Sequence, residues 1–300
     1  MKPTQLIYLG KWWARAKFLG RRSPLQSVIF ISDRCNLSCK HCTVYNHVSA
    51  QSKSYEQIKK ELEYCYSVGS RFVDFEGGEP FLWEDNGRDV NDLCDLARTL
   101  GFFSCTITTN AQKPFRNSKA DSIWVSMDGV GEYHDRVRGK GTFSRLEQNA
   151  AECAHPALSA NMAINTLNVD SVGAAIEYIN NSPYFKSISL NLHTPFKGTE
   201  KLALDNKKRE EVIDLIIDYK KKGYPIMNSI TGLRHMRDLD FEKVCWMTNF
   251  IFTDGTKSDV CAGELAGVCD KCGFCMAGEQ RAVMDLAPDT IMAGLNLRVK

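Results

Sequence analysis

The chain has 300 residues, of which 43% are hydrophobic and 25% charged, the composition of a soluble globular protein. A formal net charge of +2 gives no sign of a dedicated nucleic-acid-binding protein, and the longest apolar runs are too short to cross a bilayer. Twelve cysteines without a recognisable export signal indicate metal or redox chemistry, because disulfides rarely persist in a reducing compartment.

Residues 1–25 are predicted to form a basic amphipathic helix that ends near Gly20 or Pro24. The segment carries six Lys and Arg residues and no acidic residue, interleaved with Trp12, Trp13 and other apolar residues. Such a helix can lie in a lipid headgroup layer with its tryptophans at the boundary. Alternatively, it caps one end of the fold and leaves its basic face in water. We expect a cytoplasmic protein and hold peripheral membrane contact through residues 1–25 as a hypothesis.

Strand-like and helix-like segments alternate from residue 26 to residue 223. The predicted strands cover residues 27–32, 71–76, 102–109, 122–127, 159–166 and 187–192, and the predicted helices cover residues 55–68, 90–100, 143–153, 171–180 and 207–222. Successive β/α units predict a parallel sheet, because parallel neighbours need a crossover connection. Six units are too few for a closed eightfold barrel. We therefore predict an α/β fold in which residues 26–223 form a partial (β/α)6 barrel.

Residues 224–300 lose the alternation and contain five cysteines. The Asp254-Gly255 pair in this tail predicts the turn of a β-hairpin. We predict that the tail forms a small C-terminal cysteine-rich iron–sulfur domain.

Three cysteines, Cys35, Cys39 and Cys42, stand in a short loop directly after the first predicted strand. Active sites of parallel α/β barrels lie at the carboxyl ends of the strands, which is where this loop begins. Four cysteines saturate a cubane iron–sulfur cluster, so three would leave one iron open to another ligand. Zinc is the competing metal, but a structural zinc site needs a fourth ligand, which His41 could supply only with strain.

The cysteine loop resembles the motif of the radical S-adenosylmethionine (radical SAM) superfamily, in which three cysteines have this spacing. His41 occupies the place of the aromatic residue before the last cysteine. The resemblance implies that S-adenosylmethionine binds the open iron through its amino and carboxylate groups. It also implies reductive cleavage to a 5′-deoxyadenosyl radical, which abstracts a hydrogen atom from the substrate.

Later strand ends carry further matches to this family. The Gly77-Gly78-Glu79-Pro80 segment resembles the family motif that holds the methionine amino group, although a tight turn is its structural alternative. Arg138 is matched to a carboxylate clamp, with an exposed surface arginine as the alternative. The complete set of residues that the resemblance implies for cofactor binding is His41, Gly77, Gly78, Glu79, Pro80, Thr109, Asn110, Ser126, Asp128, Arg138 and Asn165.

The tail cysteines are Cys245, Cys261, Cys269, Cys272 and Cys275. Their pattern resembles the SPASM or twitch domains of radical SAM maturases and dehydrogenases, which hold auxiliary 4Fe–4S clusters. The resemblance implies one auxiliary cluster ligated by four of the five cysteines, and the spacing does not identify the spare one. A zinc ribbon is the structural alternative. The resemblance thus implies three cofactors: S-adenosylmethionine, a SAM-binding 4Fe–4S cluster and an auxiliary 4Fe–4S cluster.

These features predict an enzyme that abstracts hydrogen from an unactivated carbon, followed by oxidation or bond formation. Asn191 and His193, at the end of the sixth strand, are the candidate substrate contacts, and a structural histidine is equally compatible with His193. A lipid or small metabolite is the leading substrate class, and a ribosomal peptide or protein is its rival. A non-catalytic iron–sulfur electron carrier or redox sensor is the alternative of another class. The expected partner is a reductant such as a flavodoxin or ferredoxin, and no nucleic acid is expected.

Overall fold

The structure, a computed structural model, describes residues 2–42 and 50–296. The strands are β1 (Gln26–Ser32), β2 (Phe72–Gly77), β3 (Ser104–Thr109), β4 (Ser122–Ser126), β5 (Leu158–Ile164), β6 (Ser187–Leu192), β7 (Thr248–Ile251) and β8 (Lys257–Ser258). The helices are α1 (Pro3–Leu19), α2 (Tyr55–Val68), α3 (Val90–Leu100), α4 (Glu132–Arg138), α5 (Thr142–Cys153), α6 (Val172–Asn181), α7 (Asn206–Lys221), α8 (Ile230–Asp238), α9 (Ala262–Leu265), α10 (Met276–Met284) and α11 (Pro288–Asn296).

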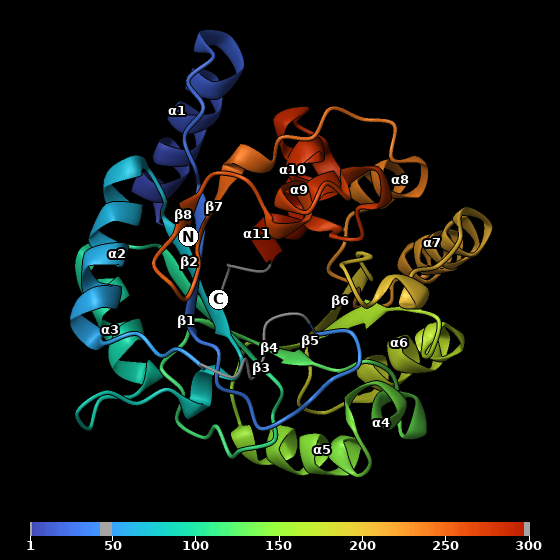
Figure 1. The fold of residues 1–300 in the computed structure, drawn as a ribbon. Helices are drawn as coiled ribbons and strands as arrows, with labels where there is room; N and C mark the ends of the chain where they lie inside the picture. Colours follow the sequence, from blue (N-terminus) through green and yellow to red (C-terminus); the bar gives the residue numbers. More distant parts are fainter. Residues whose placement is uncertain (1, 43–49, 297–300) are drawn as a thin grey trace.

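One sheet contains these strands in the order β6-β5-β4-β3-β2-β1-β7-β8. Neighbours from β6 to β7 are parallel, and β7 pairs with β8 in an antiparallel hairpin. The first six strands lie in sequence order, which confirms the predicted α/β fold with its parallel sheet. The sheet curves around an interior, and α2 to α7 lie outside it (Figure 1).

On strands β2 and β3 the outer face of the sheet is apolar and buried, whereas the inner face is polar. Successive side chains of a strand point to opposite faces. Phe75 and Ile107 point outward and are fully buried under the helices, and burying each of them stabilises the fold by about 1.5–3 kcal/mol. Asp74, Glu76 and Thr108 point to the other face and are only half-buried. On these two strands the interior face of the sheet therefore carries polar groups.

The outer helices begin and end where side-chain and backbone chemistry predicts. Ser54 accepts a hydrogen bond from the backbone N–H of Gln57 and so caps the start of α2, and Asp89 caps α3 in the same way. Gly69 and Gly101 end these helices with φ of 120° and 97°, a region that favours glycine. These local signals explain why the bounds of α2 and α3 agree with the sequence-based prediction.

The tail joins the sheet instead of standing apart from it. Residues Gln26 to Ile29 of β1 pair in parallel with Thr248 to Ile251 of β7, a pairing that the sequence pattern did not predict. The predicted hairpin at Asp254-Gly255 is present between β7 and β8. Helices α8, α9 and α10 lie between the β7–β8 edge and the β6 edge (Figure 1). Strands β7 and β8 follow residue 223 and belong to the same sheet as β1 to β6. The domain boundary placed at residue 223 therefore stays a prediction.

Helix α1 packs against the tail through a second, smaller core. Trp12 and Ala16 are buried there with Val244, Met247 and Met284. The indole N–H of Trp12 donates to the carbonyl of Ser23 at 2.9 Å, and Trp13 Nε1 donates to Met284 at 3.2 Å. These contacts support the capping interpretation of residues 1–25, and membrane contact through this helix stays a prediction. Gly20 adopts the left-handed conformation and ends α1, as predicted.

Candidate functional site

The loop with the first three cysteines leaves β1 at the carboxyl edge of the sheet. Cys39 is buried, and Cys35 and Cys42 are half-buried. The backbone N–H of Lys40 donates to Val137 at 3.0 Å, which holds the loop against α4. Burial raises the pKa of the Cys39 thiol to about 11, and the neighbouring Cys35 and Cys42 add to the rise. The structure thus brings the three predicted cysteines together.

Gly77 and Gly78 press the end of β2 directly onto this loop. Gly78 N donates to Ser32 O at 2.7 Å, and Glu79 N donates to Arg34 O at 2.8 Å. A Cβ atom would stand 2.2 Å from Ser32 O at Gly77 and 2.1 Å from Arg34 O at Gly78. Any larger residue would push the cysteine loop away, so the two glycines set the distance between β2 and the loop.

Glu79 ties the ends of β2 and β3 together from a buried position. Its carboxylate accepts hydrogen bonds from Thr109 Oγ1 at 2.8 Å and from Asn110 N at 2.7 Å. Burial raises the pKa of Glu79, while the hydrogen bonds from Asn110, Thr109 and Phe81 lower it. Glu79 and Thr109 therefore position the strand ends, and Pro80 begins a short 3-10 turn immediately after them.

Asn110 reaches the cysteine loop with its side chain. Its Nδ2 lies 3.6 Å from Cys35 Sγ and donates to Asn36 Oδ1 at 2.8 Å. The N–H of Gln112 holds Asn110 Oδ1 from the other side at 2.9 Å. The end of β3 thus orients the first cysteine.

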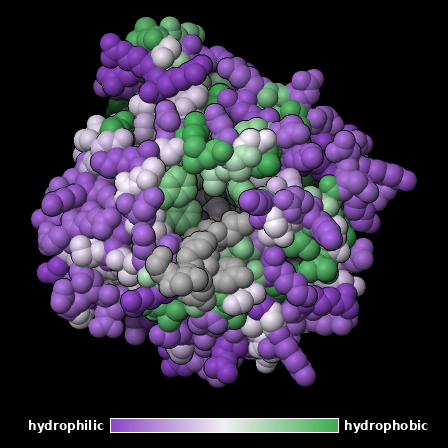
Figure 2. Space-filling model, in the orientation of Figure 1, coloured by the Kyte–Doolittle hydropathy of each residue, from purple (hydrophilic) through white to green (hydrophobic). Residues whose placement is uncertain are grey.

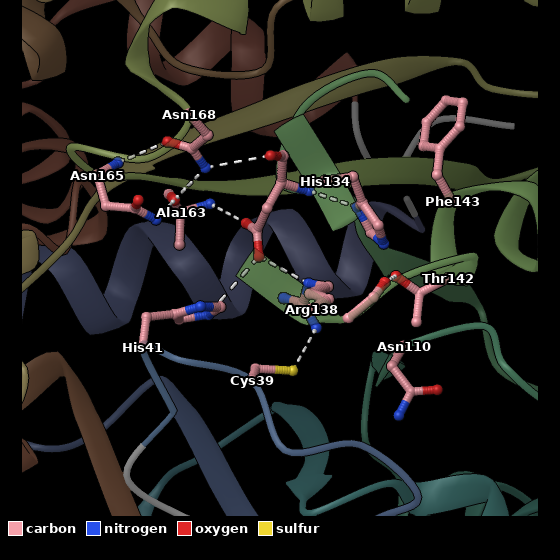
Figure 3. Close-up of polar contacts among 12 residues, drawn as sticks. Cys39, His41, Asn110, His134, Arg138, Thr142, Phe143, Ala163, Asn165 and Asn168 are labelled. Atoms are coloured by element: carbon pink, nitrogen blue, oxygen red, sulfur yellow. Dashed lines mark hydrogen bonds and ion pairs between the residues drawn. The ribbon is translucent and has the colours of Figure 1, made fainter. Parts of the chain in front are cut away.

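Arg138 forms a buried ion pair beside the second cysteine (Figure 3). Arg138 Nε donates to Asp128 Oδ2 at 2.6 Å, and Nη1 lies 3.8 Å from Cys39 Sγ. Burial alone would raise the pKa of Asp128, but Arg138, His41 and His134 hold it below its ordinary value. Arg138 is therefore not an exposed surface arginine. Its guanidinium carries a positive charge next to the cysteine loop.

Replacing Arg138 by Met should lower the free energy of unfolding by about 3–5 kcal/mol, because it leaves Asp128 buried without its cation. The double variant Asp128→Asn/Arg138→Met should recover part of this loss, since it removes both charges together. Urea denaturation followed by circular dichroism measures both values. An unchanged midpoint for Arg138→Met would contradict the buried pair.

Two histidines lie against Asp128. His41 Nε2 lies 3.7 Å from Asp128 Oδ2, and His134 Nδ1 accepts the Asp128 N–H at 3.0 Å. Burial lowers the pKa of His41 and of His134 to about 4, so both rings are neutral near pH 7. His41 Nδ1 and His134 Nε2 are buried without a hydrogen-bond partner among the described residues. A buried nitrogen of this kind is one that a bound ligand could satisfy.

The remaining candidates of β4 and β5 differ in where they point. Ser126 is half-buried at the end of β4. Asn165 is fully buried, and its side chain bonds Ala163 O and Leu167 N within its own loop. Asn168, which sequence analysis did not single out, bonds Asp128 O at 3.2 Å and so supports the ion pair (Figure 3). The cofactor contact of Asn165 stays a prediction.

Four of the five tail cysteines form one group. Cys245 and Cys261 are neighbours, and their mutual influence raises the pKa of Cys245 and lowers that of Cys261. Cys269 and Cys272 lie near both of them, since their charges raise the pKa of Cys245. Cys275 is fully enclosed at the start of α10, where burial raises the pKa of its thiol to about 12.

Arg209 on α7 is the functional residue that sequence analysis missed. It is 8% exposed, and it donates to Met236 O at 2.7 Å and to Cys272 O at 2.8 Å. Burial lowers its pKa, and in the described part of the chain the opposing charges are those of Cys275 and Cys272. A buried cation is costly unless an anion compensates it. Negative charge at the tail cysteines would therefore stabilise the buried guanidinium of Arg209.

Hydrogen bonds join the tail cysteines to the end of β6. The carbonyl of Gly273 accepts the N–H of Leu192 at 2.9 Å, and a Cβ on Gly273 would stand 2.1 Å from Leu192 O. Asn191 Oδ1 accepts the N–H of Cys275 at 3.0 Å, and its Nδ2 donates to Asn161 at 2.9 Å. The predicted substrate contact Asn191 thus links the polar interior to the auxiliary cysteines.

His193 stands between the two groups of cysteines. Its ring lies 6.3 Å from that of His41 in an edge-to-face arrangement. Its Nε2 lies 3.1 Å from both the carbonyl and the hydroxyl of Thr199, and burial lowers its pKa. The structure therefore holds the buried His193 in place by local hydrogen bonds to Thr199.

Both groups of cysteines suit iron–sulfur clusters by their donor atoms. In neither group do the described side chains converge on one point as the ligands of a single metal ion do. A cubane cluster binds each cysteine through a different iron, so its thiolates stand farther apart than the ligands of zinc. The remaining cysteines, Cys65, Cys94, Cys105 and Cys153, are buried in the core of the sheet and helices.

Residues 29–155 match the family model of the radical SAM superfamily. Among curated proteins, Fe-coproporphyrin III synthase of Methanosarcina barkeri is 26% identical over 212 residues, covering 64% of this chain and 51% of that protein. The subtilosin biosynthesis protein AlbA of Bacillus subtilis is 26% identical over 161 residues, covering 48% of this chain and 35% of AlbA. The chain thus spans about half or less of the length of these relatives.

Solved structures share the fold. Streptococcus suis SuiB bound to its precursor peptide SuiA superposes with a TM-score of 0.64 at 18% identity, covering 100% of this chain and 73% of SuiB. The enzyme anSMEcpe with bound AdoMet superposes with a TM-score of 0.59 at 19% identity, covering 84% of this chain and 78% of that one. The match extends through the tail as well as the curved sheet.

Proposed function

From the radical SAM domain that residues 29–155 carry, we propose that the chain is an enzyme that cleaves S-adenosylmethionine reductively and abstracts hydrogen from an unactivated carbon. Members of this family are enzymes that catalyse radical reactions, such as the GTP 3′,8-cyclases and Fe-coproporphyrin III synthase. One observation carries the proposal: the Gly77-Gly78 backbone, Asn110 and Arg138 all converge on the loop of three cysteines.

Cys35, Cys39 and Cys42 would bind three irons of a 4Fe–4S cluster and leave the fourth iron to S-adenosylmethionine. When bound, the cluster supplies the electron that cleaves the cofactor to a 5′-deoxyadenosyl radical. Arg138 places a positive charge near Cys39, which suits an anionic group on the adjoining iron. His41 Nδ1 is buried and has no hydrogen-bond partner among the described residues, so it could contact the adenosyl part.

The tail cysteines would hold one auxiliary 4Fe–4S cluster. We take Cys245, Cys261, Cys269 and Cys272 as the ligands, because each neighbours Cys245 or Cys261, and we take Cys275, whose neighbour is Cys272, as the spare cysteine. The buried guanidinium of Arg209 supports a cluster, because four thiolates around it would supply the anion that this cation lacks. A zinc ribbon would also supply charge, but it would require the four sulfurs to converge on one ion.

The auxiliary cluster would accept an electron from the substrate radical. Asn191 connects the polar interior with the N–H of Cys275, and Gly273 lies on the end of β6. A substrate in the interior would therefore lie between the two clusters. This arrangement suits a net oxidation, in which one electron leaves through the auxiliary cluster after hydrogen abstraction. A flavodoxin or ferredoxin would supply the first electron.

Two substrate classes remain. The relatives named for small molecules, such as the GTP 3′,8-cyclases, favour a small metabolite or lipid. The peptide bound to SuiB favours a ribosomal peptide or protein, since that structure covers the whole chain. The polar interior with Asp74, Glu76 and Thr108 fits a polar part of either class. The two classes are distinguished by whether a deuterated peptide or a deuterated small molecule transfers deuterium to the 5′-deoxyadenosine that forms.

The test of the proposal uses the full chain, reconstituted without oxygen. We expect about eight irons per chain, as two cubane clusters require, and 5′-deoxyadenosine after addition of dithionite and S-adenosylmethionine. Iron without cleavage would favour an electron carrier or redox sensor. Zinc in place of iron would overturn both cluster assignments.

A further inference from the structure

The outward face of α1 carries apolar side chains that are not packed in either hydrophobic core of the described residues. Side chains three and four residues apart share one face of a helix, and Ile7, Lys11, Ala14 and Phe18 follow this spacing on the face opposite Trp12. Ile7 is 57% exposed and Phe18 is 73% exposed. Of the eleven large hydrophobic side chains exposed in the described residues, four lie on α1. Trp13 packs edge-on against Phe18 at 5.6 Å and holds it outward.

The end of α1 combines this apolar surface with positive charge. Leu19 is 65% exposed, and the exposed Arg21 and Arg22 follow the turn at Gly20. The end of α1 projects from the body of the molecule (Figure 1), and there a hydrophobic cap is bordered by hydrophilic residues (Figure 2). We call Ile7, Lys11, Arg15, Phe18, Leu19, Arg21 and Arg22 the α1 outer face.

The segment of residues 2–22 is purely basic. Residues 2–22 contain six Lys and Arg residues and neither Asp nor Glu. Lys17 pairs with Asp285 of the tail at 3.6 Å, which anchors the helix to the body. Lys11, Arg15, Arg21 and Arg22 form no ion pair with any described residue. A second copy of the same face would be repelled by its own charge, so the occupant must be anionic as well as apolar.

We propose that the α1 outer face docks on the surface of an anionic lipid bilayer, with Phe18 and Leu19 entering the headgroup boundary and Lys11, Arg15 and Arg21 pairing with lipid phosphates. A bilayer surface offers both chemistries to one helix. The described helices include none that is long and apolar enough to cross a membrane, so the contact is peripheral. Trp12 and Ala16 keep their place in the small core, and docking requires no rearrangement of α1.

The experiment is co-sedimentation of the full chain with vesicles of phosphatidylcholine alone or of phosphatidylcholine with phosphatidylglycerol, at low and high salt. We expect binding to the anionic vesicles at low salt and loss at high salt, because salt screens exposed charges. Phe18→Ser/Leu19→Ser and Arg15→Gln/Arg21→Gln should each lower the partition coefficient at least about tenfold. Leu265→Ser, on α9 and 62% exposed, is the matched control and should bind like the parent chain.

A second readout locates the contact. Brominated acyl chains in the anionic vesicles should quench the fluorescence of Trp13, which packs on Phe18, and Trp13→Phe should remove most of that quenching. Failure of the parent chain to bind anionic vesicles at low salt would overturn the proposal. Equal binding by Phe18→Ser/Leu19→Ser would also overturn it, as would a dimer in size-exclusion chromatography that these substitutions dissociate. Iron content should be the same in all variants, so the outcome is independent of the proposed chemistry.

Discussion

Cys35→Ala, Cys39→Ala and Cys42→Ala are each expected to abolish formation of 5′-deoxyadenosine, reducing it at least about a hundredfold. Each cysteine would hold one iron of the SAM-binding cluster, and the loop offers no substitute thiol among the described residues. The iron content of each variant should fall from about eight to about four per chain. Chromatographic quantification of 5′-deoxyadenosine, with iron and sulfide analysis of the same sample, measures both effects.

Cys153→Ala is the matched control for losing a cysteine. Cys153 is buried on α5, where its thiol bonds Phe115 O at 3.5 Å, and it belongs to neither group of cysteines. Its replacement should cost only a little stability and leave cleavage of S-adenosylmethionine intact. If one of the three loop variants cleaved the cofactor at the rate of the parent chain, that cysteine would not be a ligand of the cluster.

Replacing all five tail cysteines by alanine should remove about four irons per chain while leaving part of the substrate-free formation of 5′-deoxyadenosine. The first cluster lies in a separate loop held by Val137, Gly78 and Asn110. Product formation should disappear, because the electron from the substrate radical would have no acceptor. Iron analysis and electron paramagnetic resonance of the reduced protein measure the loss. Equal loss of cleavage and product would make the tail cluster structural, since ligation can supply folding free energy.

Single replacements test which cysteine is spare. Cys272→Ala should lose the signal of the auxiliary cluster, whereas Cys275→Ala should keep it, because the group around Cys261 is complete without Cys275. Both residues are buried near Arg209, so the pair is matched for environment. Loss of the signal in Cys275→Ala with retention in Cys272→Ala would reverse the assignment.

The spacing of hydrophobic residues and the residues that end helices were enough to predict the parallel sheet. The predicted bounds of α2, α3 and β6 agree with the structure, because hydrophobic spacing and the glycines after these helices are local features. The strand β7 escaped prediction for the opposite reason. It has four residues and is recognisable only by its pairing with β1, more than two hundred positions earlier. A contact so distant leaves no periodic pattern in the chain.

The candidate site was predictable where residues follow one another and not where folding brings them together. The cysteine loop and the Gly-Gly-Glu-Pro segment are contiguous motifs. Arg138 was matched by resemblance, but its ion pair with Asp128 required the structure. Arg209 lies in a helix rich in Lys, Arg and Glu and looks there like a surface residue. Its burial against Cys272 depends on how the tail folds over α7.

The tail also completes the wall of the interior. It reaches one edge of the open sheet through the pairing of β7 with β1 and the other through the contact of Gly273 with Leu192. If its cysteines hold a cluster as proposed, the four thiolates that bind the electron acceptor also cross-link the segments that contact β1 and β6. Damage by oxygen would then do more than remove an electron acceptor. Loss of the cluster would also loosen the tail that covers the gap between the two edges of the sheet. Solvent would then reach the interior in which the radical forms.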